Sequence, residues 1–358
     1  MLTDRRPSLR VPVPVPRSSA IVPIITSGCF KGNIVSGMLE MLWSVFDIDR
    51  ACAALVDVAG YVRTDLPDAG PDQAAAWGLP DSRARIRQSL LTAPSDPGNA
   101  LRLVCFEGRE RVLIRPSQRT WDTGGIFDLD IFSRDARAAY RALVERHGWT
   151  AFGEPVDYVL GHFDVTQVVA RGPDGIVLAI IEPRQHSEVP LPPPGALSRI
   201  FNATQIVRDM DAAIAFFTDI LGWRVTMAMD IDDAVEPGAG VLGLPMPYAQ
   251  TVRRRMAIVH PDGTNDGSVE LLQIDGLHGH DYAARATAPN IGLFAARFPV
   301  TDADATAAAI VARGGTLHCA PCDVAIAGIG HTRLFAIRTP EGAILEFFQI
   351  TDTERPIP

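Results

Sequence analysis

Two glutamates lie in strand-like runs of this 358-residue chain, at positions that suit acid–base or metal chemistry. Glu270 lies in the run Val-Glu-Leu-Leu, and Glu346 follows the glycine of the turn Thr-Pro-Glu-Gly (339–342) by four residues. Because successive strand residues alternate faces, one position on each strand can point into a concave surface. We predict that both carboxylates face a shared hollow, where they hold a divalent cation or act as general acid and base.

Other residues are candidates to complete this site. His331 begins the strand expected beside that of Glu346 and is a candidate ligand or base, and His162 has a comparable place earlier in the chain. Substrate contacts are expected from Asn202, Thr204, Arg297 and Phe348. In the alternative interpretation, each glutamate forms an ion pair with an arginine such as Arg297, and His331 is an exposed strand-end residue.

A repeated strand and helix pattern positions these residues. Asp209 is expected to cap a helix that ends at Gly222, thirteen residues later. The same spacing recurs at Asp47 to Gly60, Asp135 to Gly148 and Asp302 to Gly315. Asp47 and Asp209 are 162 residues apart, whereas Asp135 and Asp302 are 167 apart, as are the turn residues Gly175 and Gly342. The sequence therefore predicts a duplicated pair of modules, each with a strand, a helix and three strands.

These motifs resemble the vicinal oxygen chelate superfamily, which includes glyoxalase I, fosfomycin-resistance enzymes, bleomycin-binding proteins and extradiol dioxygenases. The resemblance rests on Val207 to Asp211, Ala215 to Phe217, Leu221 to Trp223 and Pro340 to Glu346. It implies an α+β fold in which four βαβββ modules form two glyoxalase-like half-barrel domains. It does not by itself imply one reaction, because unrelated chemistries occur on this scaffold.

The resemblance also implies where metal ligands belong: on the first strand of each module, seven residues before the capping aspartate, and on the last strand. In the second domain these positions are Asn202, Glu270, Ala295 and Glu346, and in the first they are Glu40, Arg102, Asp128 and Ala179. Neither set contains a histidine. A site of Glu346 and Glu270 for Fe, Mn, Mg or Zn therefore departs from the family's pattern, and metal-independent acid–base chemistry is the alternative.

Composition and linkers divide the chain. A Pro- and Arg-rich arm (1–36) precedes the first predicted domain (37–184), and a Pro-rich linker (185–197) precedes the second (198–351) and a short tail (352–358). The arm is expected to be disordered, or translation begins near Met38.

The net charge of −9 argues against nucleic-acid or membrane partners, and five cysteines without regular spacing indicate a cytoplasmic protein. One pair, Cys319-Ala-Pro-Cys322, is either a redox or metal motif or an ordinary strand and turn.

The leading hypothesis is an enzyme of the lyase, isomerase or dioxygenase kind that acts on a small oxygenated, possibly aromatic, molecule. It needs no nucleotide cofactor, and a homodimer is its candidate assembly. The runner-up is a non-catalytic protein that binds or sequesters a small molecule. Extradiol ring cleavage ranks third, because in the family it relies on two histidines and a glutamate around iron.

Overall fold

The computed structural model describes residues 37–80, 84–94, 96–160, 163–185, 191–231, 241–249 and 251–352. The predicted arm (1–36), His162, part of the linker and most of the tail lie outside these residues. None of the helices in the described ranges is long and apolar enough to cross a membrane.

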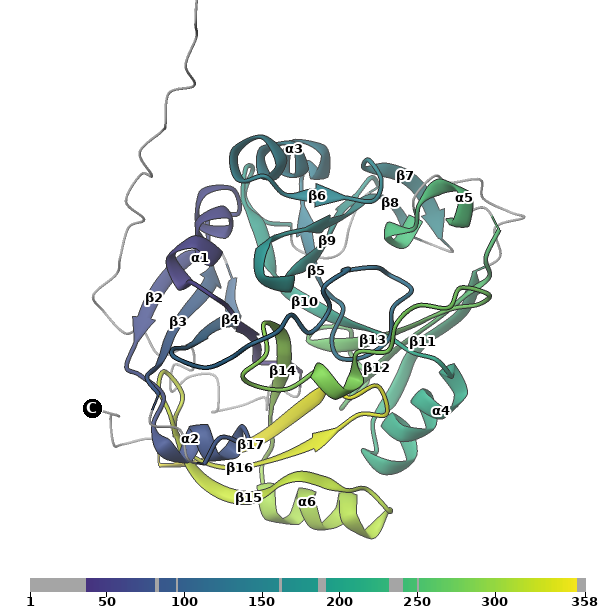
Figure 1. Ribbon diagram of the computed structural model, residues 1–358. Helices are drawn as coiled ribbons and strands as arrows, with labels where there is room; N and C mark the ends of the chain where they lie inside the picture. The colour runs from purple at the N-terminus through teal and green to yellow at the C-terminus, as the bar shows by residue number, and fades with distance from the viewer. Residues whose placement is uncertain are drawn as a thin grey trace, which may run out of the picture.

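The strands form two curved mixed sheets (Figure 1). Sheet 1 has, in spatial order, β15 (Leu317–Ile326), β16 (Gly330–Arg338), β17 (Ile344–Asp352), β14 (Gly292–Pro299), β1 (Glu40–Ser44), β4 (Asp96–Phe106), β3 (Ile86–Ala93) and β2 (Val62–Leu66). Sheet 2 has, in order, β11 (Arg224–Ile231), β12 (Arg254–His260), β13 (Ser268–Ile274), β10 (Leu197–Ile206), β5 (Asp128–Ser133), β9 (Val177–Pro183), β8 (Phe163–Arg171) and β6 (Thr150–Ala151), with β7 (Val156–Leu160) on β8.

This strand order sets which modules share a sheet. The first and fourth modules form sheet 1 through the antiparallel pair β1 and β14, and the second and third form sheet 2 through β10 and β5. The α+β fold of four modules in two half-barrels is confirmed. The expectation that modules adjacent in sequence share a hollow is wrong, because each predicted domain contributes one module to each sheet. All four modules present the same kind of first strand, so the repeat alone does not specify the partner.

The repeated helices begin where the sequence predicts. They are α1 (Ile48–Asp57), α3 (Ala136–His147), α4 (Met210–Ala215, continued by a π-helical turn over Phe216–Ile220) and α6 (Ala303–Ala312). Each capping aspartate accepts a hydrogen bond from the backbone N–H three residues later. After α6 the left-handed residue is Gly314, with φ 90°, and not Gly315 as expected.

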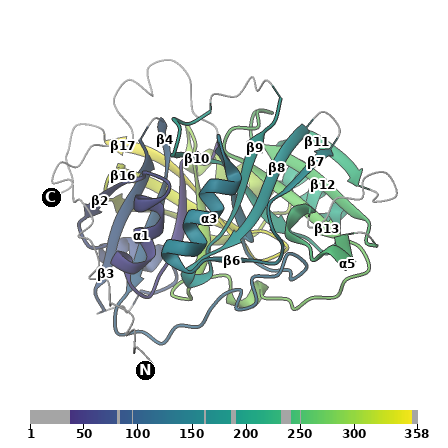
Figure 2. The same cartoon turned by 90° about the horizontal axis from the view of Figure 1, so that it is seen from above.

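The main apolar core lies where these helices cover the sheets. Its buried side chains come from both sheets and from α1, α3, α4 and α6. Viewed from above, α1 and α3 lie side by side across the two sheets (Figure 2). The helices and this core cover one face of each sheet, so the opposite, concave face of each sheet is the place where a hollow can form.

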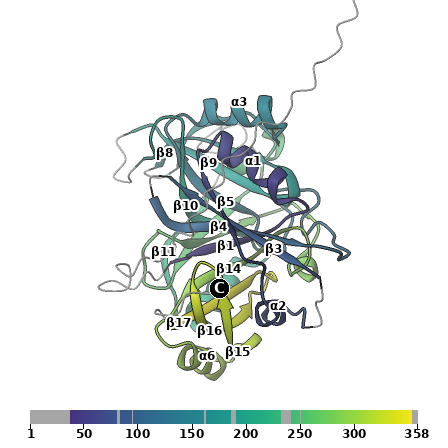
Figure 3. The same ribbon diagram turned by 90° about the vertical axis from the view of Figure 1, so that its left-hand side faces the viewer.

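Two short helices lie outside the repeat, α2 (Pro71–Ala76) and α5 (Met246–Ala249). The glycines and prolines of the segment 65–80 favour a loop when the sequence is considered alone, but Pro71 is the first residue of α2, where its missing N–H costs nothing. Two views place α2 beside β15, which is more than 200 residues later in the chain (Figures 1 and 3). This helix becomes important for the hollow of sheet 1.

Candidate functional site

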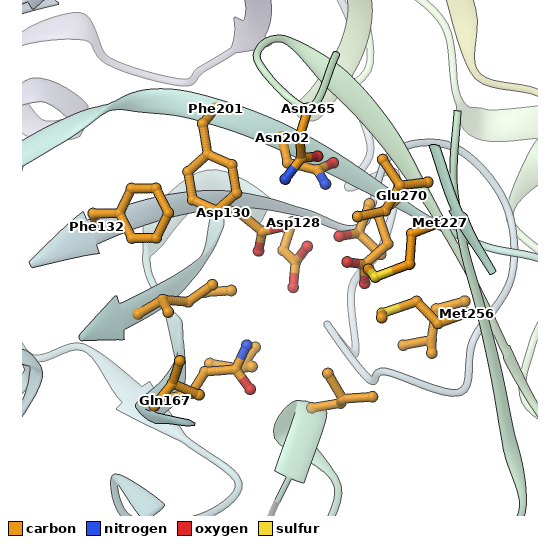
Figure 4. A pocket seen from close by; sticks show the side chains of 18 of the residues that line it. Asp128, Asp130, Phe132, Gln167, Phe201, Asn202, Met227, Met256, Asn265 and Glu270 are labelled. Carbon is orange, nitrogen blue, oxygen red and sulfur yellow. The ribbon is translucent and has the colours of Figure 1, made fainter. Parts of the chain in front are cut away.

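Sheet 2 encloses an open pocket of about 550 Å³ (Figure 4). Its floor is the concave face of β5, β9, β10 and β13, and strands β8, β11 and β12 contribute to its walls. A pocket of this volume suits a small organic molecule.

Acidic and amide side chains line the floor in two rows. Thr204 on the central strand β10 is paired with Asp128 on one side and Glu270 on the other. Two residues earlier on β10, Asn202 is paired with Asp130. Because residues two apart share a face of a strand, all these side chains point into the same hollow. Three carboxyl groups therefore meet in one pocket.

The three carboxyl groups are poorly solvated, and this changes their acidity. Burial raises the pKa of Asp128 to about 7, against the opposing effects of a hydrogen bond from Thr204 and the charge of Arg115. Burial and the nearby Asp128 raise the pKa of Glu270 to about 8. Burial and both other carboxyl groups raise the pKa of Asp130 well above its ordinary value. The pocket therefore holds protons near neutral pH, and the three groups titrate together.

Two buried oxygen atoms at this floor have no hydrogen-bond partner among the described residues. They are Oδ1 of Asp128 and Oδ1 of Asn202. The two residues are 4% and 1% exposed, so bulk water does not freely solvate them. A buried acceptor without a donor costs about 1–3 kcal/mol. A ligand that donates hydrogen bonds here would recover that cost.

The walls are apolar and soft. Phe132 and Phe201 stack with their ring centroids 4.2 Å apart and their planes 7° from parallel, and both line the pocket. Figure 4 shows Met227 and Met256 on the other side of the carboxyl groups. Polarizable, flexible methionines and a flat aromatic edge suit a ligand with an aromatic or apolar portion.

The equivalent hollow of sheet 1 is filled by an ion-pair network. Arg102 donates to both carboxylate oxygens of Glu40, over 2.7 and 2.9 Å. Arg297 donates to Glu40 over 2.7 Å and to Glu346 over 2.6 Å. Burial raises the pKa of Glu40, but the two arginines outweigh burial, so this pKa lies below its ordinary value. The four charged side chains are at most 1% exposed and compensate one another.

Trp77, which directly follows α2, fills the space above that network. Its indole N–H donates to Glu346 over 2.8 Å, and its ring meets Phe106 and Phe294 edge to face. Helix α2 lies between β2 and β3 of the first module, where the third module has the shorter α5 between β11 and β12 and the other two modules have no α-helix in the described residues. It closes the hollow that a bare half-barrel would leave open.

The structure separates the predicted site residues into two groups. Glu270, Asn202 and Thr204 line the sheet 2 pocket. Glu346 and Arg297 belong to the buried network of sheet 1, and Phe348 lies in the apolar core behind it. His331 starts β16 in sheet 1 and pairs with Asp352. The prediction that Glu270 and Glu346 face one hollow is therefore wrong, and the alternative in which Arg297 pairs with Glu346 is confirmed.

Sequence reasoning missed several pocket residues. Tyr158 and Gln167, on β7 and β8, line the pocket and share a 2.9 Å hydrogen bond from the tyrosine hydroxyl. Phe132 on β5 also lines the pocket, whereas Phe46, which follows β1 in the first module, is 46% exposed. Alternation along β8 would have marked Val165, Gln167 and Val169 as one face. The sequence did not show that this face of the second module lies in the same sheet as the third module, so these residues could not be assigned to a shared pocket.

Comparisons with known proteins agree with this architecture. Residues 199–347 match the sequence model of the Glyoxalase/Bleomycin resistance protein/Dioxygenase superfamily. Glyoxalase I from Zea mays superposes with a TM-score of 0.59 at 18% identity, over 87% of this chain and 92% of the maize chain. A candidate dioxygenase from Bacillus subtilis gives 0.50 at 12% identity, over 90% and 87% of the two chains. The comparison with curated proteins found no match.

In the described residues, the chain folds as tandem half-barrels in which the hollow of sheet 2 is an open pocket and that of sheet 1 is filled. The matched segment and the superpositions show that the chain has the vicinal oxygen chelate superfamily fold in tandem form. At these identities the structural likeness concerns the fold.

Divalent metals are common in this superfamily, so the donor set was compared with what an ion requires. The four ligand positions that now share the sheet 2 hollow are Asp128, Ala179, Asn202 and Glu270. Alanine offers no donor, and the lining residues include no histidine or cysteine. No group of three or more His, Cys, Asp or Glu side chains in the described ranges is arranged to hold an ion. These residues do not fit the metal site that the family implies.

Proposed function

We propose that the chain is a superfamily enzyme of the lyase or isomerase kind, which moves a proton on a small oxygenated molecule in the sheet 2 pocket. The observation that supports this proposal is the pair Asp128 and Glu270, whose pKa values are raised to about 7 and about 8 inside one hollow. A catalytic group works best as acid and base when its pKa is near the working pH. No nucleotide cofactor is needed for this reaction.

The proposed roles follow from position. Glu270 is the proton-transfer group, because its raised pKa leaves it partly protonated at neutral pH and its side chain keeps contact with the pocket space. Asp128, held by Thr204, shares the proton with it and keeps one oxygen available to the substrate. Asn202 orients a donor group of the substrate through its Oδ1 atom, which has no partner in the described protein.

The walls support a substrate with an aromatic or apolar part. The stacked rings of Phe132 and Phe201 lie at one side of the floor, with the methionines at the other (Figure 4). A planar substrate against the rings would place its oxygens over the carboxyl groups. Hydrogen-bond donors such as phenolic or enolic hydroxyls would satisfy the two orphaned acceptors.

A non-catalytic binding protein is the second candidate. It is favoured by the absence of histidine and cysteine from the lining residues, which leaves the pocket without a strong nucleophile or a nitrogen ligand. The same apolar walls and buried acceptors would hold a ligand without changing it.

A thermal-shift screen followed by product analysis tests the proposal. The wild-type protein is screened against phenols, α-keto acids and glutathione adducts, and each stabilising compound is incubated and analysed by mass spectrometry and NMR. We expect a chemical change in the compound, lost in Glu270→Gln and retained in folded Glu346→Gln, since only Glu270 lies in the pocket. Recovery of an unchanged ligand would favour the binding protein.

Metal analysis of protein purified without chelator is the companion measurement. A stoichiometric Fe, Mn, Mg or Zn ion that disappears in Glu270→Gln would overturn the metal-independent reaction.

A further inference from the structure

Two cysteines meet in the edge strand β15 of sheet 1, away from the proposed pocket. The Sγ atoms of Cys319 and Cys322 lie 3.8 Å apart. In a regular strand, residues three apart point to opposite faces, so their side chains cannot touch. The contact therefore requires an irregular strand.

A β-bulge supplies that irregularity. Cys319 is paired with Ala336 on β16, and Cys322 is paired with Leu334, so three steps on β15 oppose two steps on β16. The extra residue lies in the segment that contains Pro321, which lacks the N–H that a regular ladder needs. The bulge restores a common face to the two cysteines.

The bulge also brings the two backbones within reach of a disulfide. Because they face residues two apart on β16, the two Cα atoms are separated by roughly two strand steps, or about 6.6 Å. Disulfides form across Cα separations of about 4.4–6.8 Å. Side-chain rotation is then enough to close the gap between the sulfurs.

Their surroundings make the pair reactive. Both cysteines are half-buried on an edge strand, whereas Cys52 and Cys105 are buried. A hydrogen bond from Cys319 and the positive charge of Arg333 hold the pKa of Cys322 at about 7, against the effect of burial. The same hydrogen bond and burial raise the pKa of Cys319. The two thiols share one proton, which either sulfur can donate, and the charge of Arg333 favours the thiolate on Cys322.

We propose that Cys319 and Cys322 are a reversible dithiol–disulfide site that exchanges with low-molecular-weight disulfides. The Cys322 thiolate attacks one sulfur of the disulfide, forms a mixed disulfide and releases one thiolate. Cys319 loses its proton and attacks Cys322 Sγ, which releases the second thiolate and closes the internal bond. The two cysteines lose two electrons and two protons, and the small disulfide is reduced to two thiols.

The disulfide would fix the place where α2 docks. Helix α2 packs against β15, and Cys319 contacts the apolar groups that contain Trp77 and Ala76. Oxidation therefore acts on the strand beneath the helix that closes the sheet 1 hollow. The sheet 2 pocket lies in the other sheet and is not part of this site.

Peptide mapping tests the proposal on the full-length chain. The protein is incubated at neutral pH with oxidised glutathione, alkylated under denaturing conditions and digested with trypsin. Both cysteines fall in one peptide, 314–333, because no Lys or Arg lies between Arg313 and Arg333. We expect this peptide to escape alkylation and to lose the mass of two hydrogens, with recovery on reduction by dithiothreitol. A peptide that stays doubly alkylated, or that carries glutathione without an internal bond, would overturn the proposal.

Single variants separate the two roles. Cys319→Ser is expected to stop at glutathione bound to Cys322, and Cys322→Ser to slow the reaction of the remaining thiol by about tenfold or more. Circular dichroism establishes that each variant is folded. Equal reaction rates for the two variants would contradict the assignment of Cys322 as the attacking thiol. Peptides with Cys52 and Cys105 serve as internal controls and should show only alkylation.

Discussion

The two hollows occupy equivalent places in a repeated chain, yet their charges are arranged in opposite ways. Offsets of 162 and 167 residues align Glu40 with Asn202 and Arg297 with Asp130. The strand pairing agrees, because Glu40 faces Arg297 across β1 and β14, as Asn202 faces Asp130 across β10 and β5. The floor of the sheet 1 hollow therefore has an arginine at the position where the floor of the sheet 2 hollow has an aspartate.

The remaining positions follow the same rule. Arg102 is paired with Leu42, and Glu270 with Thr204, the residue 162 positions after Leu42, so these two lie in corresponding places. Glu346 corresponds to Ala179. At these four positions sheet 1 has two arginines and two glutamates, whereas sheet 2 has two acids, an asparagine and an alanine. The third acid of sheet 2, Asp128, corresponds to Ala295 of sheet 1 at the offset of 167 residues. The same scaffold therefore forms two different hollows. In sheet 1 the buried charges neutralise one another and the hollow is closed, whereas in sheet 2 the uncompensated carboxyl groups can bind protons or a ligand.

Glu40→Gln should have the largest effect, because it removes the acid that holds both buried arginines. Breaking a buried ion pair by removing one partner typically costs 3–5 kcal/mol, so we expect the free energy of unfolding to fall by about 3 kcal/mol or more. Urea unfolding followed by circular dichroism measures the change. A loss below about 1 kcal/mol would show that the network is not the closing element of sheet 1.

Glu270→Gln, the same exchange in the open hollow, should have the opposite sign. The unfolded chain releases this proton near the ordinary pKa of 4.5, whereas the folded chain keeps it to about pH 8. Between these values the folded state binds more protons, so wild-type stability falls as pH rises.

At pH 8 we expect Glu270→Gln to be more stable than wild type by about 2 kcal/mol. This is roughly half of what the shift from 4.5 to about 8 gives at about 1.4 kcal/mol per pKa unit, because the side chain is half-buried and solvent screens its charge. The variant should also lose stability less steeply between pH 5 and 8. Urea unfolding at several pH values measures both effects. A variant that is less stable than wild type at pH 8 would contradict the view that this carboxyl group lacks compensation.

Trp77→Phe should have the smallest effect of the three. Phenylalanine keeps most of the aromatic packing against Phe106 and Phe294 but cannot donate to Glu346. A lost hydrogen bond to a charged group costs about 1.5–3 kcal/mol when the group is left without a partner. Because Arg297 continues to hold the carboxylate, we expect the free energy of unfolding to fall by only about 1 kcal/mol. Thermal unfolding measures it, and Phe294→Leu, which alters packing without touching the hydrogen bond, is the matched control. Equal losses in both variants would assign the role of Trp77 to packing alone.

Local features of the fold were predictable from the sequence. The capping aspartates at Asp47, Asp135, Asp209 and Asp302 begin helices as expected, and the strand-like run that contains Glu270 is strand β13. These features depend on residues a few positions apart, so the local pattern contains the necessary information. The resemblance also named all four positions that line the open pocket, Asp128, Ala179, Asn202 and Glu270, but it divided them between two predicted sites.

The assembly of the site was not predictable in the same way. Whether Glu270 shares a hollow with Asp128 or with Glu346 depends on which module pairs with the third one through its first strand. Because the four modules have similar sequence patterns, long-range packing decides that pairing. The closure by α2 was missed because Gly70 and Pro71 are typical of both loops and helix starts. Trp77 therefore appeared to lie in a loop, although it covers Glu346.

The pairing of β1 with β14 links the first strand of the described residues to a strand much later in the chain, and the paired residues Glu40 and Arg297 are 257 positions apart. During synthesis, the first module exposes an incomplete sheet edge until the last module emerges, whereas the second and third can pair as soon as β13 is made. Folding should proceed from the inside of the chain outward, with a slow final closure set by this long loop. A cut at the proline-rich linker would leave two fragments, each holding half of both sheets and neither a complete core.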